Sequence, residues 1–312
     1  MESIQQTLRH FSAFKERGPS LQGLVEKLKQ EPVIEAFLEK VPEASTRLLE
    51  KELTKAYEVV EADKHCQACP GLDRCPNLLA GYQPHLMYDK GSLTVSYKPC
   101  SLKMAYEAQI RQKALIQSYY VPQDVLQATF RTLDKSEPGR QDAIEAAGLF
   151  VKRYLDQPRG IKGLYLHGQF GVGKTHIMGA IMNALAERAQ VESLMVYTPD
   201  FFRELKGAIQ DQTVEEKLEY TRTVPLLILD DIGAETMSPW IRDDVLGSIL
   251  QRRMMNGLPT LFTSNYDLDE LEEHLAYSNK SGTELLKAKR LMERIRYYCD
   301  AVSLRGMNRR GR

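Results

Sequence analysis

Residues 168–175 read GQFGVGKT, which fits the phosphate-loop pattern of Gly, four residues and then Gly-Lys-Thr. Glycine lets a backbone wrap closely around phosphate groups and point its N–H groups at them. The lysine brings a point charge to the β- and γ-phosphates, and the threonine hydroxyl is a ligand for Mg²⁺. The sequence therefore predicts a site for ATP and Mg²⁺. The nucleotide-binding residues predicted in this loop are Gly168, Gly171, Gly173, Lys174 and Thr175.

The neighbours of the loop support this interpretation. A short apolar run, Leu164–Leu166, precedes it, and Ile177, Ile181 and Leu185 follow at helical spacing. A strand before the loop and a helix after it are what the motif requires. The positive N-terminal end of that helix favours an anion. This context argues against a glycine-rich turn without function.

Beyond residue 124, short apolar runs alternate with helical stretches. Strands separated by helices form a parallel sheet that is covered on both faces. We therefore predict an α/β domain over residues 124–312 with a five-stranded parallel sheet. The expected strands are Gly163–Leu166, Leu194–Tyr197, Leu226–Leu229, Thr260–Phe262 and Ala301–Leu304.

Polar side chains follow two of these expected strands. Asp230 and Asp231 come directly after one of them, at the sheet edge where such folds bind their ligands. We expect Asp230 to hold Mg²⁺ and Asp231 to orient or deprotonate the attacking water. Asn265 follows the next strand and is a candidate contact of the γ-phosphate. On spacing alone, a helix cap before Leu268 explains Asn265 equally well.

The N-terminal third has a different character. Its first sixty residues show apolar positions at helical spacing, and four of the five cysteines follow between residues 66 and 100. A close cysteine pair with later cysteines is typical of a structural zinc site. We predict a small helical zinc-binding domain over residues 1–105 and a linker over residues 106–123. The predicted metal ligands are Cys66, Cys69, Cys75 and Cys100, with His65 and His85 as candidates to replace one cysteine.

The overall composition limits the classes of function. The 312 residues are 43% hydrophobic and 27% charged, and the sequence holds no run of eighteen apolar residues that would span a membrane. The polar N-terminus lacks the apolar core of a signal peptide, so we expect a cytoplasmic protein without a membrane partner. With 42 basic and 42 acidic residues, any contact with nucleic acid must be a local patch or depend on assembly.

Four sequence blocks together resemble a known family. They are the phosphate loop, LDDIG at residues 229–233, TSN at residues 263–265 and RLMER at residues 290–294. With the cysteine cluster, the chain is similar over nearly its whole length to the DnaC/DnaI-type helicase loaders, which are AAA+ ATPases. The resemblance implies slow hydrolysis of ATP to ADP and phosphate, used as a switch to load the replicative hexameric DNA helicase onto single-stranded DNA. The implied partners are that helicase, single-stranded DNA, other primosome proteins and further copies of the chain.

The resemblance also implies roles for individual residues. Lys174, Asp231 and Asn265 match catalytic positions, and Asn265 is the first sensor. The aspartate at 231 stands where many AAA+ proteins have glutamate, which implies slow turnover. Arg294 matches the arginine finger that reaches a neighbouring subunit's ATP, although without the resemblance a solvated helix face is the better explanation. Arg309 lies where the second sensor arginine belongs, and the choice between Arg309 and Arg310 stays open.

The resemblance assigns two further regions. It places the helicase-binding surface in residues 1–105. An aromatic and basic segment, residues 199–206, lies near the helix that faces single-stranded DNA in related loaders. A role of Phe201 and Phe202 in the core is at least as good an explanation.

Two other functions fit a phosphate loop. A small-molecule kinase would need a lid and an acceptor pocket, and the paired aspartates, Asn265 and the late arginines argue against it. An accessory AAA+ ATPase of transposition has a similar core. The cysteine-bearing N-terminal half argues against that second alternative.

Overall fold

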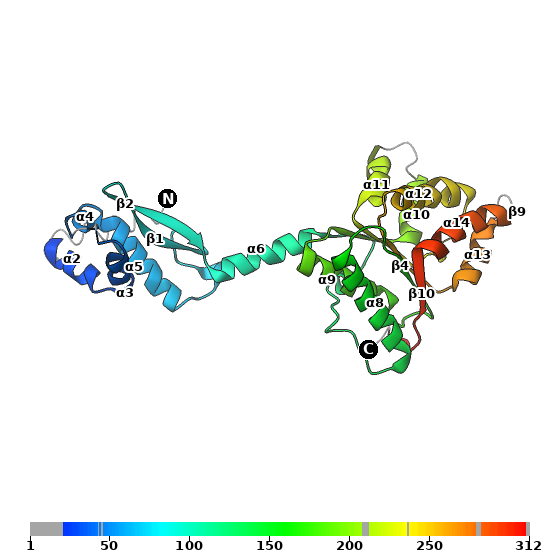
Figure 1. Cartoon of the computed structure of the whole chain (residues 1–312), viewed down its shortest axis with the longest axis horizontal. Coiled ribbons are helices and arrows are strands. Elements are labelled where there is room, and N and C mark those ends of the chain that lie inside the picture. Colours follow the sequence, from blue (N-terminus) through cyan, green and yellow to red (C-terminus); the bar gives the residue numbers. More distant parts are fainter. Residues whose placement is uncertain are drawn as a thin grey trace. The chain divides into compact units, whose positions relative to one another are not determined.

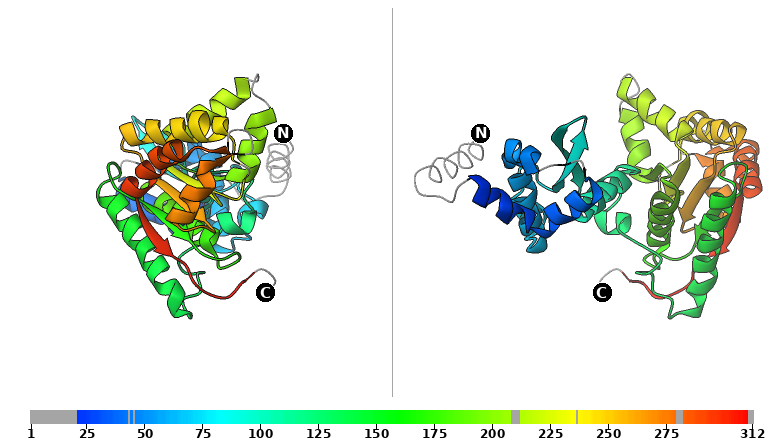
Figure 2. Two further views of the ribbon diagram at one scale, coloured as in Figure 1. Left: turned by 90° about the vertical axis from the view of Figure 1, so that its right-hand side faces the viewer. Right: turned by 60° about the vertical axis from the view of Figure 1, so that its left-hand side comes forward.

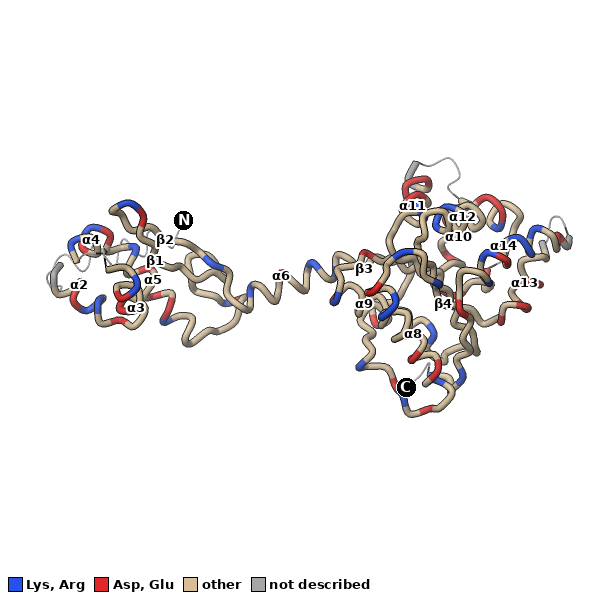
Figure 3. Tube along the Cα trace, in the orientation of Figure 1, with Lys and Arg blue, Asp and Glu red and all other residues tan. Residues whose placement is uncertain are grey.

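The structure is a computed structural model that describes residues 21–42, 44, 46–207, 212–235, 237–278 and 282–309. It divides into two compact units, Met1–Ile110 and Arg111–Arg312 (Figure 1). Among the described residues, no helix combines the length and the apolar character needed to cross a membrane. Figure 3 shows acidic and basic residues interspersed along both units, as the zero net charge of the sequence suggests.

The N-terminal unit is a group of short helices packed on a β-hairpin. Its core gathers Ile34, Leu49, Ala56 and Leu93, all almost fully buried. The elements are α2 (Leu21–Lys29), α3 (Pro32–Lys40), α4 (Thr46–Lys51), α5 (Leu53–Gln67), η1 (Leu72–Arg74), β1 (Tyr82–Asp89), β2 (Ser92–Pro99) and α6 (Ser101–Ala114), which continues into the second unit.

The hairpin is an addition to the small helical domain that the sequence predicted. Strands β1 and β2 pair antiparallel from Tyr82↔Pro99 to Asp89↔Ser92. The connecting residues Lys90 and Gly91 have φ angles of 44° and 87°. Two successive residues with positive φ form the tight turn that matches the twist of paired strands. No strand was predicted between residues 66 and 100.

The C-terminal unit is a parallel sheet with helices on both faces. The strand order is β10-β4-β7-β6-β5-β3, and every pair in this sheet is parallel. The strands are β3 (Ile116–Tyr119), β4 (Gly163–His167), β5 (Ser193–Tyr197), β6 (Leu226–Asp230), β7 (Thr260–Ser264) and β10 (Cys299–Ser303). The helical elements are α7 (Gln123–Leu126), α8 (Pro138–Asp156), α9 (Lys174–Ala189), α10 (Thr198–Gly207), α11 (Gln212–Thr223), η2 (Trp240–Leu246), α12 (Gly247–Met255), α13 (Leu268–Ala276) and α14 (Leu285–Tyr298). A short pair, β8 (Tyr277–Ser278) and β9 (Gly282–Thr283), precedes α14.

All five expected strands are present, but the sheet has six strands, so the predicted strand number is wrong. The additional strand, β3, lies in the segment that the sequence analysis assigned to the linker. It has four residues, IQSY, and pairs with β5 at the edge of the sheet. A half-buried edge strand of this length carries no apolar run that would distinguish it from a linker.

Both faces of the sheet are buried, and the side chains of β6 pack alternately into the core on each face. Leu226 and Ile228 pack with residues of α8 and α9, whereas Leu227 and Leu229 pack with residues of α10 to α14. Figure 2 shows β10 running beside α8. A strand that is apolar on both sides is what a doubly covered parallel sheet needs. It also carries the next residues of the chain to the sheet's carboxyl edge.

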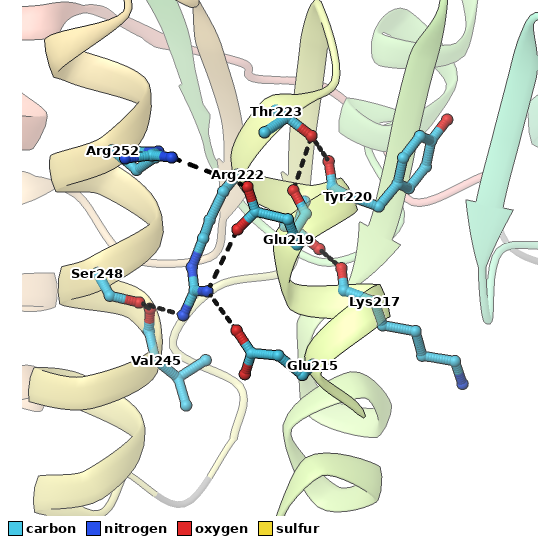
Figure 4. A network of polar contacts seen from close by, with 10 residues as sticks. Glu215, Lys217, Glu219, Tyr220, Arg222, Thr223, Val245, Ser248 and Arg252 are labelled. Atoms are coloured by element: carbon cyan, nitrogen blue, oxygen red, sulfur yellow. Dashed lines mark hydrogen bonds and ion pairs between the residues drawn. The ribbon is translucent and has the colours of Figure 1, made fainter. Parts of the chain in front are cut away.

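Polar contacts join α11 to its neighbour α12 (Figure 4). The guanidinium of Arg222 donates to Glu215 Oε1 at 2.8 Å and to Ser248 Oγ at 3.1 Å. Arg222 also forms an ion pair with Glu219 at 3.6 Å, and Arg252 approaches the same carboxylate at 4.0 Å.

Phe201 and Phe202 of α10 are fully buried, which supports the core interpretation of these two residues.

Candidate functional site

The phosphate loop lies between β4 and α9 in the conformation that its glycines allow. Gly168, Gly171 and Gly173 have φ angles of 152°, 76° and 93°. A Cβ atom at Gly168 would also lie 2.1 Å from the carbonyl oxygen of Leu304. Only glycine adopts such angles readily, and here a side chain has no space. The loop therefore has the strand-loop-helix context that the sequence predicted.

Lys174 begins α9 and its side chain turns back over the loop. Its ammonium donates to the carbonyl oxygens of Gly168 at 2.8 Å and Gln169 at 3.0 Å, and to Asn265 Oδ1 at 2.8 Å. The side chain is buried, with 7% of its surface exposed. A buried ammonium group that donates to these neutral oxygens is well placed to bind an anionic ligand.

Two carboxylates stand at the end of β6, next to that lysine. Asp230 is buried and accepts a hydrogen bond of 2.6 Å from the hydroxyl of Thr263, and the same hydroxyl accepts from the backbone N–H of Asp231 at 2.8 Å. Burial raises the pKa of Asp230 to about 6, and the nearby charge of Asp231 acts in the same direction. Hydrogen bonds from Thr263 and Thr175 act in the opposite direction. Asp230 and Thr175 are thus neighbours, as a shared metal ion would require.

Asn265 links the lysine to the second carboxylate. Its amide nitrogen donates to Asp231 Oδ1 at 2.7 Å while its oxygen accepts from Lys174. The cap of helix α13 is Asp267, which forms a complete capping box with Glu270. Asn265 therefore does not cap that helix, and the alternative that the sequence left open is wrong. The structure brings together Lys174, Asn265 and Asp231 in one continuous polar chain.

Arg294 lies elsewhere in the unit. Its guanidinium donates to the carbonyl oxygen of Gly247 at 3.0 Å, and the neighbouring Arg290 is exposed. Helix α14 ends where β10 begins, and Cys299 pairs in register with Gly163, the first residue of β4. Arg294 is thus near the amino edge of the sheet, whereas the phosphate loop follows the carboxyl edge. This position does not allow Arg294 to act on the phosphate loop of its own subunit.

Arg309 lies beside the phosphate loop, but its charge is already paired. Its backbone N–H donates to the carbonyl oxygen of Gly171 at 2.9 Å. Its guanidinium contacts Asp134 at 2.6 Å and Glu137 at 2.8 Å, and the pairing with Asp134 is the main reason that its pKa is raised. Arg310, the alternative second sensor, lies outside the described residues.

Two residues near the loop had no role predicted for them from the sequence. Arg140 of α8 is 2% exposed, and its guanidinium donates to the carbonyl oxygens of Val172 and Asp134. Thr263 bridges the two aspartates, as described above. Arg140 comes from a helix distant in sequence, and nothing in its local pattern distinguishes it from a surface arginine.

The four N-terminal cysteines lie near the ends of three elements: Cys66 is in the last turn of α5, Cys69 follows that helix, Cys75 follows η1 and Cys100 follows β2. Three of the sulfurs have an N–H group nearby: Asn77 Nδ2 at 3.5 Å from Cys66, Gly81 N at 3.3 Å from Cys75 and Lys103 N at 3.4 Å from Cys100. Such donors suit thiolate ligands. However, in the part of the chain that the structure describes, no three metal-binding side chains are gathered into one cluster.

The remaining candidates near the cysteines have other contacts. Nδ1 of His65 lies 3.3 Å from Asn77 Oδ1, and His85 is on β1 opposite Ser96. Cys299 is buried and its thiol donates to the carbonyl oxygen of Thr260 at 3.4 Å, so it belongs to the core of the C-terminal unit.

The phosphate loop follows β4, Asn265 follows the neighbouring strand β7, and the buried Asp230 ends β6, the strand beyond it. This arrangement on a parallel sheet defines a P-loop ATP-binding protein of the AAA+ class. Comparisons with known proteins agree. The family model described as "IstB-like ATP binding protein" matches residues 142–312, and the model described as "Primosomal protein DnaI N-terminus" matches residues 1–97.

The replicative helicase loader DnaI of Bacillus subtilis (strain 168) is 43% identical over 311 residues, which cover 99% of each chain. This chain belongs to the DnaI family of replicative helicase loaders. A crystal structure of DnaI is 48% identical, with a TM-score of 0.54, and covers 64% of this chain and 99% of that one. The DnaC helicase loader shares the fold at 23% identity and a TM-score of 0.51, covering 59% of this chain and 100% of that one.

Proposed function

We propose that this chain is an ATP-dependent loader that places the replicative hexameric DNA helicase onto single-stranded DNA during primosome assembly. The observation that carries the proposal is the full-length match to a replicative helicase loader, because it spans both units. A transposition ATPase would share the ATPase core and a small-molecule kinase the phosphate loop, but the full-length match includes the N-terminal unit as well. The match of a DnaI-type model to residues 1–97 therefore favours the loader.

ATP binding follows from the groups around the loop. The phosphates of ATP would take the place of the carbonyl and amide oxygens that now accept from Lys174, and the N–H groups of the loop and the start of α9 would hold them. Asp230 and Thr175 are the residues that would bind Mg²⁺, which neutralises charge on the phosphates when bound.

Hydrolysis would use the polar chain that ends at Asp231. This carboxylate would orient or deprotonate the attacking water, while Asn265 holds it in place and senses the γ-phosphate. The aspartate side chain is one methylene shorter than the glutamate common at this position, which supports slow turnover. Arg309 would reach the phosphates only after it leaves Asp134 and Glu137.

Assembly would complete the site. Arg294, remote from its own loop, is the group that would stabilise the transferring phosphoryl on a neighbouring subunit. Turnover would then report that copies of the chain have come together. The helicase-binding surface would lie in the N-terminal unit, where the four cysteines would hold a structural zinc. The protein would act in the cytoplasm, with single-stranded DNA and the other primosome proteins as partners.

The test is association with the replicative helicase of the same organism, measured by size-exclusion chromatography with light scattering. We expect a defined complex in the presence of Mg²⁺ and ATP. Residues 111–312 alone should not form it. Failure of the full chain to bind the helicase in any nucleotide state would contradict the proposal, and transfer of phosphate from ATP to nucleosides would favour the kinase instead.

A further inference from the structure

Glu235 is a buried acid close to the nucleotide site that no sequence motif points to. It follows the turn after Asp231 and exposes 7% of its surface. Its Oε2 accepts hydrogen bonds from the backbone N–H of Gly233 at 3.0 Å and from the hydroxyl of Thr198 at 3.3 Å. Its other oxygen, Oε1, has no hydrogen-bond partner among the residues that the structure describes.

Such a group is costly to bury. An unsatisfied buried oxygen loses its hydration without compensation, and native proteins hold few of them. Burial raises the pKa of Glu235 to about 7, and the nearby charge of Asp231 contributes in the same direction. An apolar residue would avoid this cost at a position without a role. We therefore looked for a role of Glu235 in the contacts that it makes with its neighbours.

The neighbours form the turn that carries Asp231. Asp231 itself has a φ of 58°, and Gly233 has a φ of 94°. A non-glycine residue with positive φ is unfavourable by itself and persists only where surrounding contacts impose it. On the side of β7, Thr263 supplies those contacts by accepting from the N–H groups of Asp231 and Ile232 at 2.8 Å and 2.9 Å. Glu235 supplies the contact at the far end of the turn, on the N–H of Gly233.

Glu235 is itself held from two other elements. The hydroxyl of Thr198, at the start of α10, lies 3.1 Å from the carbonyl oxygen of Asp230 as well as 3.3 Å from Glu235. Nε2 of His274 on α13 lies 3.2 Å from the backbone oxygen of Glu235, and the ring of His274 stacks on Tyr266. The side chain and the backbone of Glu235 are thus both fixed to the packed core.

We propose that Glu235 is a positioning residue for ATP hydrolysis, whose buried carboxylate fixes the turn that keeps Asp231 against Asn265. The inference rests on the proposed ATPase activity and adds a residue to it. Glu235 does not touch the phosphate loop, so it should affect the chemical step and leave nucleotide binding intact. A misplacement of a catalytic group by about 1 Å costs about a hundredfold in rate, which sets the scale of the effect.

The experiment compares Glu235→Ala and Glu235→Gln with the parent chain in single-turnover hydrolysis, with Mg²⁺–ATP affinity measured separately by calorimetry. The alanine variant should hydrolyse at least about tenfold more slowly and bind ATP within about threefold of the parent. The glutamine variant keeps an oxygen for Gly233 and Thr198 and offers an amide in place of the unpaired Oε1, so it should stay within about threefold of the parental rate. Glu187→Ala, an exposed acid on α9, is the matched control.

Three results would overturn the inference: a parental rate in Glu235→Ala, an ATP affinity that falls as far as the rate, or a glutamine variant as slow as the alanine variant. If Glu235→Ala does not fold, Thr198→Val tests the same contact, since it removes one of the two donors to Oε2. We then expect slower hydrolysis at unchanged affinity, and a parental rate in Thr198→Val would overturn the inference. A parent chain without any turnover would instead contradict the proposed ATPase activity.

Discussion

The two units of this chain hold their polar groups in different ways. In the C-terminal unit, the segments that follow β4, β6 and β7 bring Lys174, Asn265 and Asp231 into one hydrogen-bonded chain. In the N-terminal unit, Cys66, Cys75 and Cys100 each lie near an N–H group, but the metal-binding side chains of the described residues are not gathered into a cluster. A parallel sheet therefore preorganises its site through the backbone, whereas a cysteine site in a small unit depends on the metal that would join it.

The largest expected effect concerns the metal. If Cys66, Cys69, Cys75 and Cys100 bind one zinc, each freshly purified chain holds one zinc ion by metal analysis. Structural zinc contributes about 10 kcal/mol or more to folding in small domains, so a strong chelator should abolish the helical signal in the circular dichroism of residues 1–110. Cys69→Ser should bind zinc weakly, whereas Cys299→Ser should bind it normally. A freshly purified chain without zinc, or a Cys69→Ser variant that retains its zinc fully, would contradict this site.

Next in size is the loss of Arg294, because a finger arginine is often worth about a thousandfold in turnover. Arg294→Ala should bind ATP normally but hydrolyse it very slowly. Mixed with Lys174→Ala, it should regain activity, with a maximum at intermediate ratios, because an intact pocket then meets an intact arginine. Arg296→Ala, which removes an exposed arginine of the same helix, is the control. If mixed oligomers form but hydrolysis is not restored, Arg294 either acts on the ATP of its own chain or serves only to stabilise the fold.

Replacement of Lys174 should weaken ATP binding by about a hundredfold. The loss follows from charge-assisted hydrogen bonds, which are worth about 1.5–3 kcal/mol each. Lys174→Ala should leave the N-terminal unit folded, which separates the two units experimentally. The matched control is Lys162→Ala, an exposed lysine paired with Asp300. Calorimetry with an unchanged dissociation constant would show that the phosphate loop does not bind through this lysine.

Asp231→Asn should slow single-turnover hydrolysis by at least about tenfold, because a general base or a water-orienting group is worth that much or more. ATP and Mg²⁺ should still bind, since Asp230 is unchanged. The asparagine side chain keeps the shape of the aspartate and its contact with Asn265. An unaltered rate would assign the catalytic role to another group.

The smallest expected effect is on the pH dependence of Mg²⁺-dependent ATP affinity. The pKa of Asp230 is raised to about 6, so this carboxyl takes up a proton as the pH falls from 8 to 5.5. Because Mg²⁺ needs the ionised form, the Mg²⁺-dependent part of the affinity should fall about fourfold over that range. Binding of ATP without Mg²⁺ corrects for protonation of the phosphates. Asp230→Asn should show no such fall. If the Mg²⁺-dependent affinity of the parent chain does not change with pH, the metal binds elsewhere.

The sequence predicted those features that depend on neighbours in the chain. The phosphate loop, the aspartates after β6 and all five expected strands are local patterns, and the structure contains them. Strand β3 was missed because a short edge strand has little apolar character, and the hairpin because its turn depends on two positive φ angles. No role was predicted for Thr263, Arg140 or Glu235, because their contacts join distant segments. Asn265 was ambiguous until Asp267 appeared as the cap of α13.

The most direct test of the account is helicase loading itself. The replicative helicase, a circular single strand with an annealed oligonucleotide and this chain are combined with Mg²⁺ and ATP, and release of the oligonucleotide reports loaded helicase. We predict rapid release with the parent chain, and release at the level of helicase alone with Lys174→Ala or with residues 111–312. Equal release by the parent and Lys174→Ala would contradict an ATP-dependent loader.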